Sequence, residues 1–479
     1  MTKNNKNFEM KPFLINGEWR ETKETFIIKS PFTQKTIAEV STANRDEIEE
    51  AIGAAENAAK EMRKLARFQI AKGLRAVADG IEKRKKEFAE TIAEEAAKPI
   101  IYARGEVERG ISTFAWAAGE AERFAGKIVP VDTQAGGKGK MAWTLRVPRV
   151  VIYGITPFNF PLNLVAHKVA PALASGNAII IKPSEKTPLS ALLLGEVFQE
   201  SGLPNSALQV VPMNVENIDL VLRDERIQMI SFTGSAEIGW KLKNLAQRKQ
   251  IALELGGNAP VIVDDSADLE KSLDRCVVGA FAYSGQVCIS VQRVYVHEKI
   301  FDQWTEKFVE KTQKLRKGNP LDESTQLSVM IEENAAKRAQ NWIDEAVKAD
   351  AELLCGGTRD GAMLDATVLT NTNSEMRVVS EEIFAPVAIV EKFSEFAEAV
   401  DLSNQSKYGL QAGVFTQNLS NANYATENLE YGGVIINDAP TFRVDNMPYG
   451  GVKQSGFGRE GVRYAMEEMS EIRLIVLNS

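Results

Sequence analysis

The chain has 479 residues, of which 44% are hydrophobic and 25% charged, and this composition suits a globular protein of about two or three domains. Its 57 Lys and Arg residues against 65 Asp and Glu residues give a net charge of −8, which supplies no basic surface for nucleic acid or anionic membranes. No apolar stretch reaches the roughly 18 residues of a membrane span, and MTKNNKNFEMKPF has no signal-peptide core. We therefore expect no nucleic-acid or membrane partner.

Cysteine and histidine are both scarce. Cys276, Cys288 and Cys355 are too widely spaced for a disulfide framework or a zinc site, and they indicate a cytoplasmic protein with reduced thiols. With two histidines, a His-rich metal site is excluded and we expect no metal. His297 ends the apolar run RVYV and is expected at the surface, whereas His167 lies in an apolar helical run. We expect neither histidine to activate a cysteine.

The first part of the chain is predicted to be helical after a short β-like entry, PFLINGEWRE. Between Ala66 and Ala93 apolar residues recur at three- and four-residue steps, which predicts one amphipathic helix that Pro99 terminates. A second helix is expected over 106–124.

Alternating strands and helices then predict two α/β units. Residues 136–148, GGKGKMAWTLRVP, are typical of a hairpin standing off the body, and from 149 the runs RVVIYGI, NAIIIKP, LQVVPM, QMISFTG and QIALELGG alternate with helices. Such β-branched runs without alternating polarity are typical of buried parallel strands, and doubly wound sheets of this kind bind nucleotides at the carboxyl ends of their strands.

A second alternation begins near residue 257, with APVIVDD, a helix over 267–283, RVYVHE, helices over 299–316 and 334–349, and short strands through GGVIIND. The terminal strand RLIVLNS is expected to pair with another edge, in this chain or in another subunit. We predict a nucleotide-binding domain from 1–128 and 149–256, a second α/β domain over 257–453, and a small β arm from 129–148 and 454–479.

Two motifs suggest ligand binding at strand ends. In FTGS, Gly234 and Ser235 open a helix whose free N–H groups could hold a phosphate. In IIIKPSEKTP, Lys182, Ser184 and Glu185 follow a buried strand and serve either as a binding loop or as a solvated one. The spacing in GFGREG is that of a dinucleotide fingerprint, but no strand precedes it and no βαβ unit follows, so we interpret it as a glycine-rich loop.

Three further residues carry potential chemistry. Glu254 in ELGG ends an apolar segment and is either paired or kept with a raised pKa for proton transfer. Asn159 in ITPFNFPL is either a structural amide or a hydrogen-bond donor to a ligand. Cys288 in FAYSGQVCIS is either a small buried side chain or a nucleophile. Together they supply a nucleophile, a general base and an oxyanion donor on a nucleotide-binding fold.

The ordered motifs ITPFNFPL, IIIKPSEKTP, FTGS, LELGG, GQVCISVQR, EEIFAPV and YGGVKQSGFGREG resemble the signatures of the NAD(P)-dependent aldehyde dehydrogenase superfamily. This resemblance implies a Rossmann-like doubly wound NAD-binding domain, a second α/β catalytic domain and a small β oligomerisation arm. It further implies a homodimer or homotetramer, bridged by the 136–148 hairpin and RLIVLNS.

By the same resemblance, Cys288 attacks an aldehyde to give a thiohemiacetal, whose oxyanion is held by the Asn159 amide and the Cys288 N–H. Hydride transfer to NAD(P)⁺ leaves a thioester, which a water activated by Glu254 hydrolyses to the acid. One alternative is a CoA-acylating semialdehyde dehydrogenase, whose branch lacks this glutamate. The other is a non-redox cysteine esterase or thioesterase, which needs a histidine near Cys288.

The resemblance also assigns the cofactor site. A carboxylate at Glu185 disfavours a 2′-phosphate, so NAD is favoured and NADP stays an alternative. Ala385 stands where the family usually has glycine after the phenylalanine of EEIFAP. The implied cofactor-binding residues are Thr156, Pro157, Lys182, Ser184, Glu185, Gly234, Ser235, Glu382 and Phe384.

The substrate pocket is expected around Phe158, Val287, Ile289, Phe442 and Arg443. Arg443 either binds a phosphate, carboxylate or sulfonate of the substrate, or pairs with Asp445 or a surface acid. The FRVD…MPYGG stretch resembles the branch that acts on small hydroxylated aldehydes such as lactaldehyde. Val287 stands where enzymes for phosphorylated aldehydes often have arginine, which argues against glyceraldehyde 3-phosphate.

Overall fold

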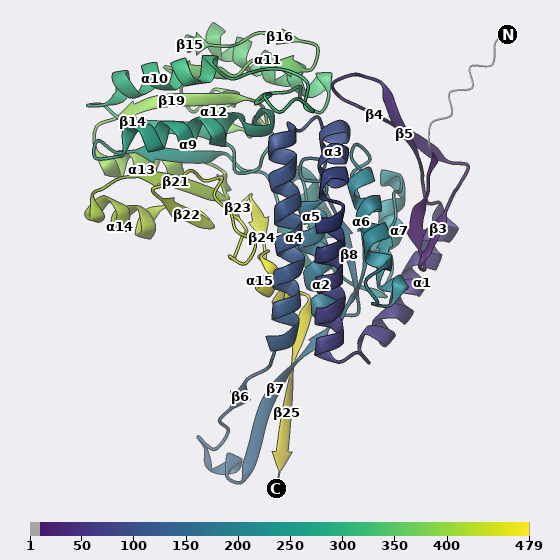
Figure 1. Cartoon of the computed structure of the whole chain (residues 1–479). Coiled ribbons are helices and arrows are strands. Elements are labelled where there is room, and N and C mark those ends of the chain that lie inside the picture. Colours follow the sequence, from purple (N-terminus) through teal and green to yellow (C-terminus); the bar gives the residue numbers. More distant parts are fainter. Residues whose placement is uncertain (1–9, 479) are drawn as a thin grey trace, which may run out of the picture.

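The computed structural model describes residues 10–478, so residues 1–9 of the predicted nucleotide-binding domain and residue 479 of the predicted arm lie outside it. Two α/β units lie side by side, and a long β arm projects from one of them (Figure 1). Among the described residues, no helix is long and apolar enough to cross a membrane.

An eight-stranded sheet forms the first unit. Strands β8 to β12 of this sheet are mutually parallel, whereas β24, β2 and β3 are antiparallel to their neighbours. From β8 the chain moves outward on one side to β9 and β10, and on the other to β11 and β12. The sheet order is β24 (Gly456–Phe457), β12 (Gln250–Glu254), β11 (Ile227–Thr233), β8 (Val151–Ile155), β9 (Ala178–Lys182), β10 (Leu208–Val210), β2 (Phe13–Ile15) and β3 (Glu18–Arg20).

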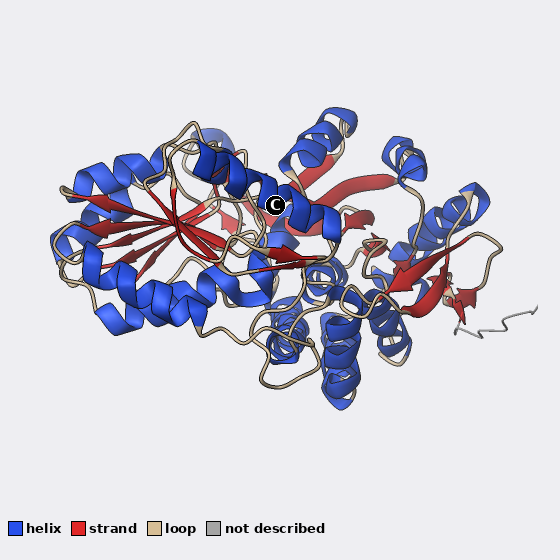
Figure 2. Cartoon of the chain, turned by 90° about the horizontal axis from the view of Figure 1, so that it is seen from above, coloured by secondary structure: helices blue, strands red, loops and turns tan. Residues whose placement is uncertain are grey.

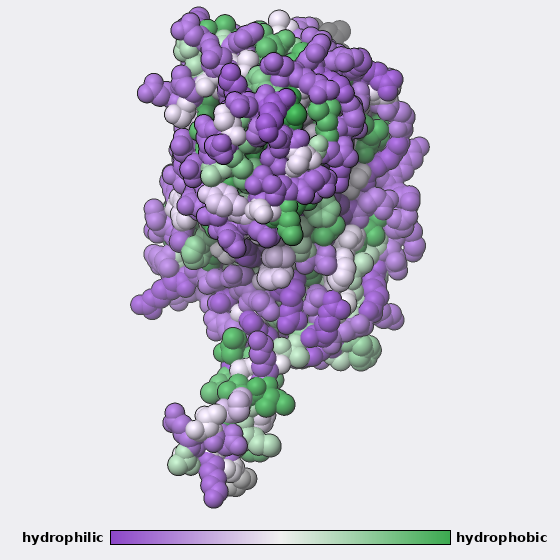
Figure 3. Space-filling view, turned by 90° about the vertical axis from the view of Figure 1, so that its left-hand side faces the viewer, coloured by the Kyte–Doolittle hydropathy of each residue, from purple (hydrophilic) through white to green (hydrophobic). Residues whose placement is uncertain are grey.

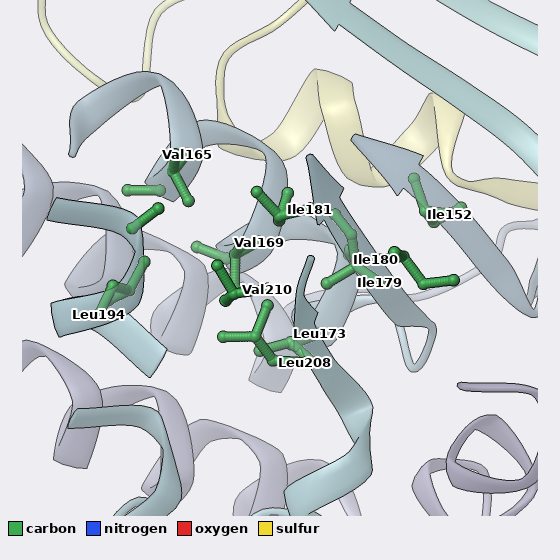
Figure 4. Close-up of a cluster of buried hydrophobic side chains, with 14 of the residues drawn as sticks. Ile152, Val165, Val169, Leu173, Ile179, Ile180, Ile181, Leu194, Leu208 and Val210 are labelled. Atoms are coloured by element: carbon green, nitrogen blue, oxygen red, sulfur yellow. The ribbon is translucent and has the colours of Figure 1, made fainter. Parts of the chain in front are cut away.

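The predicted parallel strands of this unit are confirmed, and their apolar runs form its core. β8 and β9 are buried along their whole length. Figure 4 shows Ile179, Ile180 and Ile181 of β9 among side chains of α5 (Asn163–Ala174), α6 (Leu189–Gln199) and β10. Since both faces of these strands are covered, the runs contain almost no polar residue.

The single helix predicted over 66–93 is wrong, because the chain forms α2 (Arg67–Lys83) and α3 (Lys85–Ala96) with a break at Arg84. Arg84 leaves the helical conformation, at φ −105° and ψ 16°, inside a KRKKE stretch that offers no apolar residue to pack. Phe68, one of the apolar residues on whose spacing the single helix was predicted, is 67% exposed. The next helix, α4 (Ile100–Arg123), begins directly after Pro99, earlier than the predicted 106.

The second unit contains a seven-stranded sheet with helices on both faces (Figure 2). Successive side chains of β13 (Ala259–Val263) point to opposite faces of this sheet, so Val261 and Val263 lie in one core and Ile262 in the other. His297 ends β14 as predicted, but it is buried against Phe393 and not at the surface. The sheet order is β15 (Glu352–Cys355), β18 (Thr367–Thr370), β19 (Val387–Phe393), β14 (Val291–His297), β13 (Ala259–Val263), β21 (Gln411–Phe415) and β22 (Gly433–Ile436).

The arm consists of β6 (Ile128–Val129), β7 (Lys140–Pro148) and β25 (Ser470–Asn478). The terminal strand has its partner in the same chain, because β25 pairs antiparallel with β7 from Ser470↔Pro148 to Asn478↔Lys140. Residues 454–469, predicted to belong to the arm, lie in β24 and α15 (Val462–Glu468), which pack on the first unit. Apolar side chains are exposed on the arm (Figure 3), among them Ile128, Met141, Ile472, Leu474 and Val476.

Shorter strands and the other helices complete the described chain. The short strands are β1 (Met10–Lys11), β4 (Thr25–Lys29), β5 (Thr36–Ser41), β16 (Arg359–Asp360), β17 (Met363–Leu364), β20 (Tyr408–Gly409) and β23 (Val452–Lys453). The helices are α1 (Arg45–Met62), α7 (Ile218–Arg223), α8 (Ala236–Leu245), α9 (Leu269–Phe281), α10 (Phe301–Gln313), α11 (Glu333–Lys348), α12 (Arg377–Ser380), α13 (Phe396–Asn404) and α14 (Leu419–Asn428).

Candidate active site

A cavity of about 460 Å³ lies between the two units and contains residues from both. The first unit contributes to the cavity the residues that follow the carboxyl ends of β8, β11 and β12, beside the point where the strand order of the sheet reverses. Open α/β sheets bind their ligands at such a reversal point. The lining residues are Pro157, Phe158, Asn159, Leu164, Lys186, Thr233, Gly234, Ser235, Glu254, Leu255, Gly256, Gln286, Cys288, Ile331, Glu332, Asn334, Ala335, Arg338, Glu382 and Phe384.

Cys288 reaches this cavity from the connection between α9 and β14. A short 3-10 helix, Ala282–Gly285, precedes it, and Tyr283 and Ser284 adopt left-handed φ angles of 51° and 53°. The Tyr283 hydroxyl donates to the Ala96 carbonyl at 3.0 Å, and the Ser284 hydroxyl to the Ser328 carbonyl at 2.6 Å. Backbone strain of this kind persists where the surroundings hold it, as they do next to many active sites.

The Cys288 sulfur lies 3.0 Å from the hydroxyl of Tyr449. Burial raises the pKa of this thiol to about 11, against the lowering effects of the Tyr449 hydrogen bond and the positive charge of Arg443. Cys276 and Cys355 are buried without contact with the cavity, and burial raises the pKa of both thiols. Only one of the three cysteines is therefore presented to a ligand.

Asn159 lines the same cavity as Cys288. Its Nδ2 donates to the Gln286 carbonyl at 2.9 Å, which ties the asparagine to the loop that carries the cysteine. The Gln286 side chain in turn accepts the N–H of Ile331 at 3.0 Å. Because Nδ2 carries two hydrogens, one stays available to an oxygen in the cavity.

Glu254 ends β12 and is buried, with Oε2 lacking a hydrogen-bond partner. Burial and the nearby Glu460 raise its pKa well above the usual value. The two glycines that follow allow close approach: a Cβ on Gly256 would lie 2.2 Å from the Glu382 carboxylate, and one on Gly257 2.2 Å from the Cys288 carbonyl. Gly256 and Gly257 therefore allow the chain after β12, which carries Glu254, to lie directly against the loop that carries Cys288.

A buried charged network adjoins these residues, and no local sequence pattern indicated it. Lys168 of α5 donates to Ser231, to Thr233 and to Glu460 at 3.1 Å. Although burial opposes it, the charges of Lys168 and Arg443 lower the pKa of Glu460 to about 2. This fixed negative charge is one cause of the raised pKa of Glu254.

Arg443 pairs with the buried Glu460 at 3.3 Å, so its partner is neither Asp445 nor a surface acid, which was one of the two alternatives left open by the sequence. Asp445 is held instead by Arg109 at 2.9 Å and His167 at 3.0 Å. The guanidinium of Arg443 also lies 3.6 Å from the ring centroid of Tyr449. Arg443 and Arg109 thus each form a salt bridge with a buried carboxylate of the protein, Arg443 with Glu460 and Arg109 with Asp445.

Gly234 and Ser235 line the end of the cavity where β11 meets α8. Ser235 is the N-cap of this helix, and its hydroxyl accepts the N–H of Ile238 at 3.5 Å. The free N–H groups of the first turn fit the pyrophosphate of a dinucleotide, since helix N-termini bind anions. Glu382 and Phe384 line the same cavity nearer to Cys288. The Oε1 of Glu382 accepts the N–H of Gly257 at 2.9 Å. Burial raises the pKa of Glu382 to about 7, against the lowering effect of this hydrogen bond.

At the end of β9 and in the loop that follows it, Lys182, Ser184 and Glu185 lie outside the cavity lining, whereas Lys186 is part of it. Lys182 is buried and its Nζ lies 3.5 Å from Glu185, whose side chain is 44% exposed. The Thr156 N–H donates to the Lys182 carbonyl at 3.2 Å, and the Ser184 hydroxyl accepts the N–H of Lys186 at 3.2 Å. The loop thus continues the binding edge of the sheet one strand beyond the cavity.

Of the predicted substrate residues, Phe158 lines the cavity and meets Phe384 edge to face, with ring centroids 6.0 Å apart. Within the described chain, Val287, Ile289, Phe442 and Arg443 are not part of this lining. Ile289 packs with Tyr449 in a small apolar cluster, and Phe442 is 42% exposed. Arg338, Lys186 and Glu332, which were not singled out in the sequence, line the cavity instead.

Residues 10–478 contain no group of three or more His, Cys, Asp or Glu that could hold a metal ion.

A doubly wound sheet whose cavity joins a helix N-terminus to a cysteine, a glutamate and an asparagine is the arrangement expected of a dinucleotide-dependent enzyme. A model of the aldehyde dehydrogenase family matches residues 19–475. The chain belongs to this family, and it is an NAD(P)-dependent oxidoreductase that acts on aldehydes, with the predicted α/β fold.

Relatives and solved structures match almost the whole chain. A 3-sulfolactaldehyde dehydrogenase from Priestia megaterium is 44% identical over 466 residues, 97% of each chain. A lactaldehyde dehydrogenase from Methanococcus aeolicus is 40% identical, covering 97% of this chain and 99% of its own. The crystal structure of aldehyde dehydrogenase 21 from Physcomitrella patens, in complex with the reaction product succinate, superposes with a TM-score of 0.97 at 42% identity over 98% of both chains.

Proposed function

We propose that the protein oxidises a small aldehyde to the free acid, with Cys288 as nucleophile, Asn159 as oxyanion donor and Glu254 as general base. The observation that carries this proposal is the convergence of the three side chains in one cavity, together with the N-terminus of α8. Bound NAD(P)⁺ supplies the hydride acceptor.

Each protein group has a task that its surroundings support. Cys288 Sγ, as thiolate, bonds to the aldehyde carbon, and the carbonyl oxygen becomes an oxyanion near the free N–H of Asn159 and the Cys288 peptide N–H. After oxidation, the acyl group remains on Sγ as a thioester. Glu254 then takes a proton from water, whose oxygen attacks the thioester and releases the acid and the thiolate.

The presence of Glu254 in the cavity favours hydrolysis over acyl transfer to CoA. The carboxyl is buried with a raised pKa, so its conjugate base accepts a proton more readily than an exposed carboxylate does. A non-redox esterase is disfavoured because His167 bonds to Asp445 and Thr113, and His297 accepts the N–H of Lys299, so neither imidazole is hydrogen-bonded to Cys288.

We propose a short hydroxylated aldehyde such as lactaldehyde as substrate. Its support is the similarity to enzymes named lactaldehyde and 3-sulfolactaldehyde dehydrogenase, and the edge-to-face pair of Phe158 and Phe384 in the cavity wall, which takes up space beside Cys288. The 3-sulfolactaldehyde relative makes a sulfonated analogue the second candidate, with Lys186 or Arg338 of the cavity wall, or Arg443 behind it, as the cation.

A panel assay tests the activity and the substrate class together. NADH absorbance is followed with lactaldehyde, 3-sulfolactaldehyde, glycolaldehyde, succinic semialdehyde and an aromatic aldehyde. The proposal expects the highest kcat/KM for the hydroxylated three-carbon aldehydes, without CoA. Equal turnover of all five aldehydes overturns the substrate proposal, whereas ester hydrolysis without NADH from any aldehyde overturns the dehydrogenase mechanism.

We propose NAD as the preferred dinucleotide, because the Glu185 carboxylate would repel a 2′-phosphate, and Lys182 and Glu185 as the residues that bind its ribose. The other predicted cofactor residues, Thr156, Pro157 and Ser184, remain part of this proposal. Comparing kcat/KM for NAD⁺ and NADP⁺ tests it, and a preference for NADP⁺ contradicts it.

We further propose a homodimer or homotetramer formed through the arm. The exposed apolar side chains on β6, β7 and β25 support it, since such a surface on a monomer marks an interface. A sedimentation measurement tests the oligomeric state, and a monomer contradicts the proposal.

We also propose that the protein resides in the cytoplasm. Its three free cysteines support a reducing compartment. Localisation of a tagged protein tests this proposal.

A further inference from the structure

Tyr449 contacts the reacting sulfur directly. Its hydroxyl lies 3.0 Å from Cys288 Sγ, and its side chain is buried with Ile289 and Leu410 around it. A thiolate has no proton to give, so in the ionised state the phenol is the donor of this hydrogen bond. The contact therefore favours the charged form of the sulfur.

Other residues hold Tyr449 in this position. The backbones of Tyr449 and Glu460 exchange two hydrogen bonds, at 3.0 and 2.6 Å. Glu460 pairs with Arg443, whose guanidinium covers the face of the Tyr449 ring at 3.6 Å. A cation over the ring face is attracted to the π electrons and makes the phenol hydrogen a better donor.

The surroundings of the thiol make such a donor necessary. Burial raises its pKa, the carboxylates of Glu382 and Glu254 add to this effect, and the groups that act in the opposite direction are Tyr449 and Arg443. Burial also raises the pKa of Tyr449 well above the usual value, so the phenol stays protonated while the thiol ionises.

We infer that Tyr449 is a further catalytic residue, which donates a hydrogen bond to the Cys288 thiolate, and that Arg443 is a positioning residue for Tyr449. This inference rests on the proposed nucleophilic role of Cys288. On ionisation the thiol proton passes to solvent, and Tyr449 keeps its own proton.

The hydrogen bond acts before the carbon–sulfur bond forms. Once Sγ is bonded to carbon, it is only a weak acceptor, and the contribution of Tyr449 is largely lost. Loss of the hydroxyl therefore lowers the reactivity of the free enzyme's thiol, and the hydrogen bond returns only when hydrolysis of the thioester releases the thiolate.

Alkylation of Cys288 by iodoacetamide, measured from pH 6 to 11 without aldehyde or dinucleotide, tests this inference in wild type and Tyr449→Phe. Mass spectrometry of the Cys288 peptide gives the rate. Removing a hydrogen bond to a charged group corresponds to a loss of roughly tenfold, so the rate near neutral pH falls about tenfold. Because the pKa of the thiol rises in the variant, its rate profile is displaced towards higher pH over the whole measured range. Superimposable profiles overturn the inference.

Tyr153→Phe is the matched control. Its buried hydroxyl also lies next to a sulfur, 3.6 Å from Met213 Sδ, in the first unit and outside the cavity lining. This variant is expected to keep the wild-type alkylation profile. If it shifts the profile as much as Tyr449→Phe does, the effect is a general one of buried hydroxyl loss and the inference fails.

Arg443→Lys separates the positioning role from substrate binding. A lysine keeps the positive charge and loses the planar stacking, so its alkylation profile is expected between those of wild type and Tyr449→Phe. A wild-type profile with a raised KM for anionic aldehydes overturns the positioning role. Should Cys288→Ala retain dehydrogenase activity, the proposed function itself fails, which is a different result from an unchanged Tyr449→Phe profile.

Discussion

The two ends of the cavity are built in different ways. The dinucleotide end is a strand-to-helix junction at Gly234 and Ser235, where peptide N–H groups do the binding and the motif is continuous in sequence. The thiol end assembles Asn159, Glu254 and Cys288 from three separate segments, with Tyr449 from a fourth.

This difference in construction indicates which end of the cavity should tolerate single substitutions. Backbone donors at a helix N-terminus survive most side-chain substitutions, so the dinucleotide end should respond weakly to single mutations. The thiol end depends on individual side chains that are buried and partly unsatisfied, such as Glu254 with its free Oε2. Substitutions there remove a whole chemical task.

Cys288→Ala should give the largest effect, a loss of at least about 10³-fold in kcat, because no second thiol lines the cavity in the described chain. Cys276→Ala is the matched control, since its thiol is buried in α9 away from the cavity. NADH formation measures both. Equal losses of kcat in Cys288→Ala and Cys276→Ala would contradict the assignment of Cys288 as the nucleophile.

Asn159→Ala should lower kcat about 10²- to 10³-fold, because it removes one oxyanion donor and the link to Gln286. The dinucleotide affinity, measured by fluorescence titration, should change little, because Gly234 and Ser235 are untouched. A large loss of dinucleotide affinity with normal kcat would reverse the assigned roles of the two ends.

The pH dependence should also originate at the thiol end. The pKa values of Glu254 and Cys288 are both raised, and both groups act in their deprotonated forms, so kcat/KM should rise from pH 6 towards alkaline pH. Dinucleotide affinity should vary less over this range. A kcat/KM that falls on going from pH 6 to 9 would contradict the assignment.

Glu185→Gln should give the smallest effect, a gain of about tenfold or less in kcat/KM for NADP⁺, because it removes a negative charge that is screened at a 44% exposed side chain. Activity with NAD⁺ should fall only slightly. No change with either dinucleotide would place the ribose away from this loop.

The sequence predicted the strands, the cavity's three central residues and the helix N-terminus, because each depends on a local pattern: an apolar run, or a polar residue at the end of one. It failed where the outcome depends on contacts between distant segments. Lys168 and Glu460 lie 292 positions apart, and nothing near Arg443 indicates that Glu460 will be its partner. The predicted helix over 66–93 failed for a related reason, since apolar spacing continues across the break at Arg84.

The most direct test of the proposed mechanism is a pre-steady-state burst experiment with Glu254→Gln and an excess of lactaldehyde and NAD⁺. The account predicts a burst of NADH close to one equivalent per active site, followed by a steady rate about 10²- to 10⁴-fold below wild type. The Cys288 peptide should carry the acyl group, seen as a mass increase. Full steady-state turnover without CoA, or an unmodified Cys288 after the burst, would contradict it.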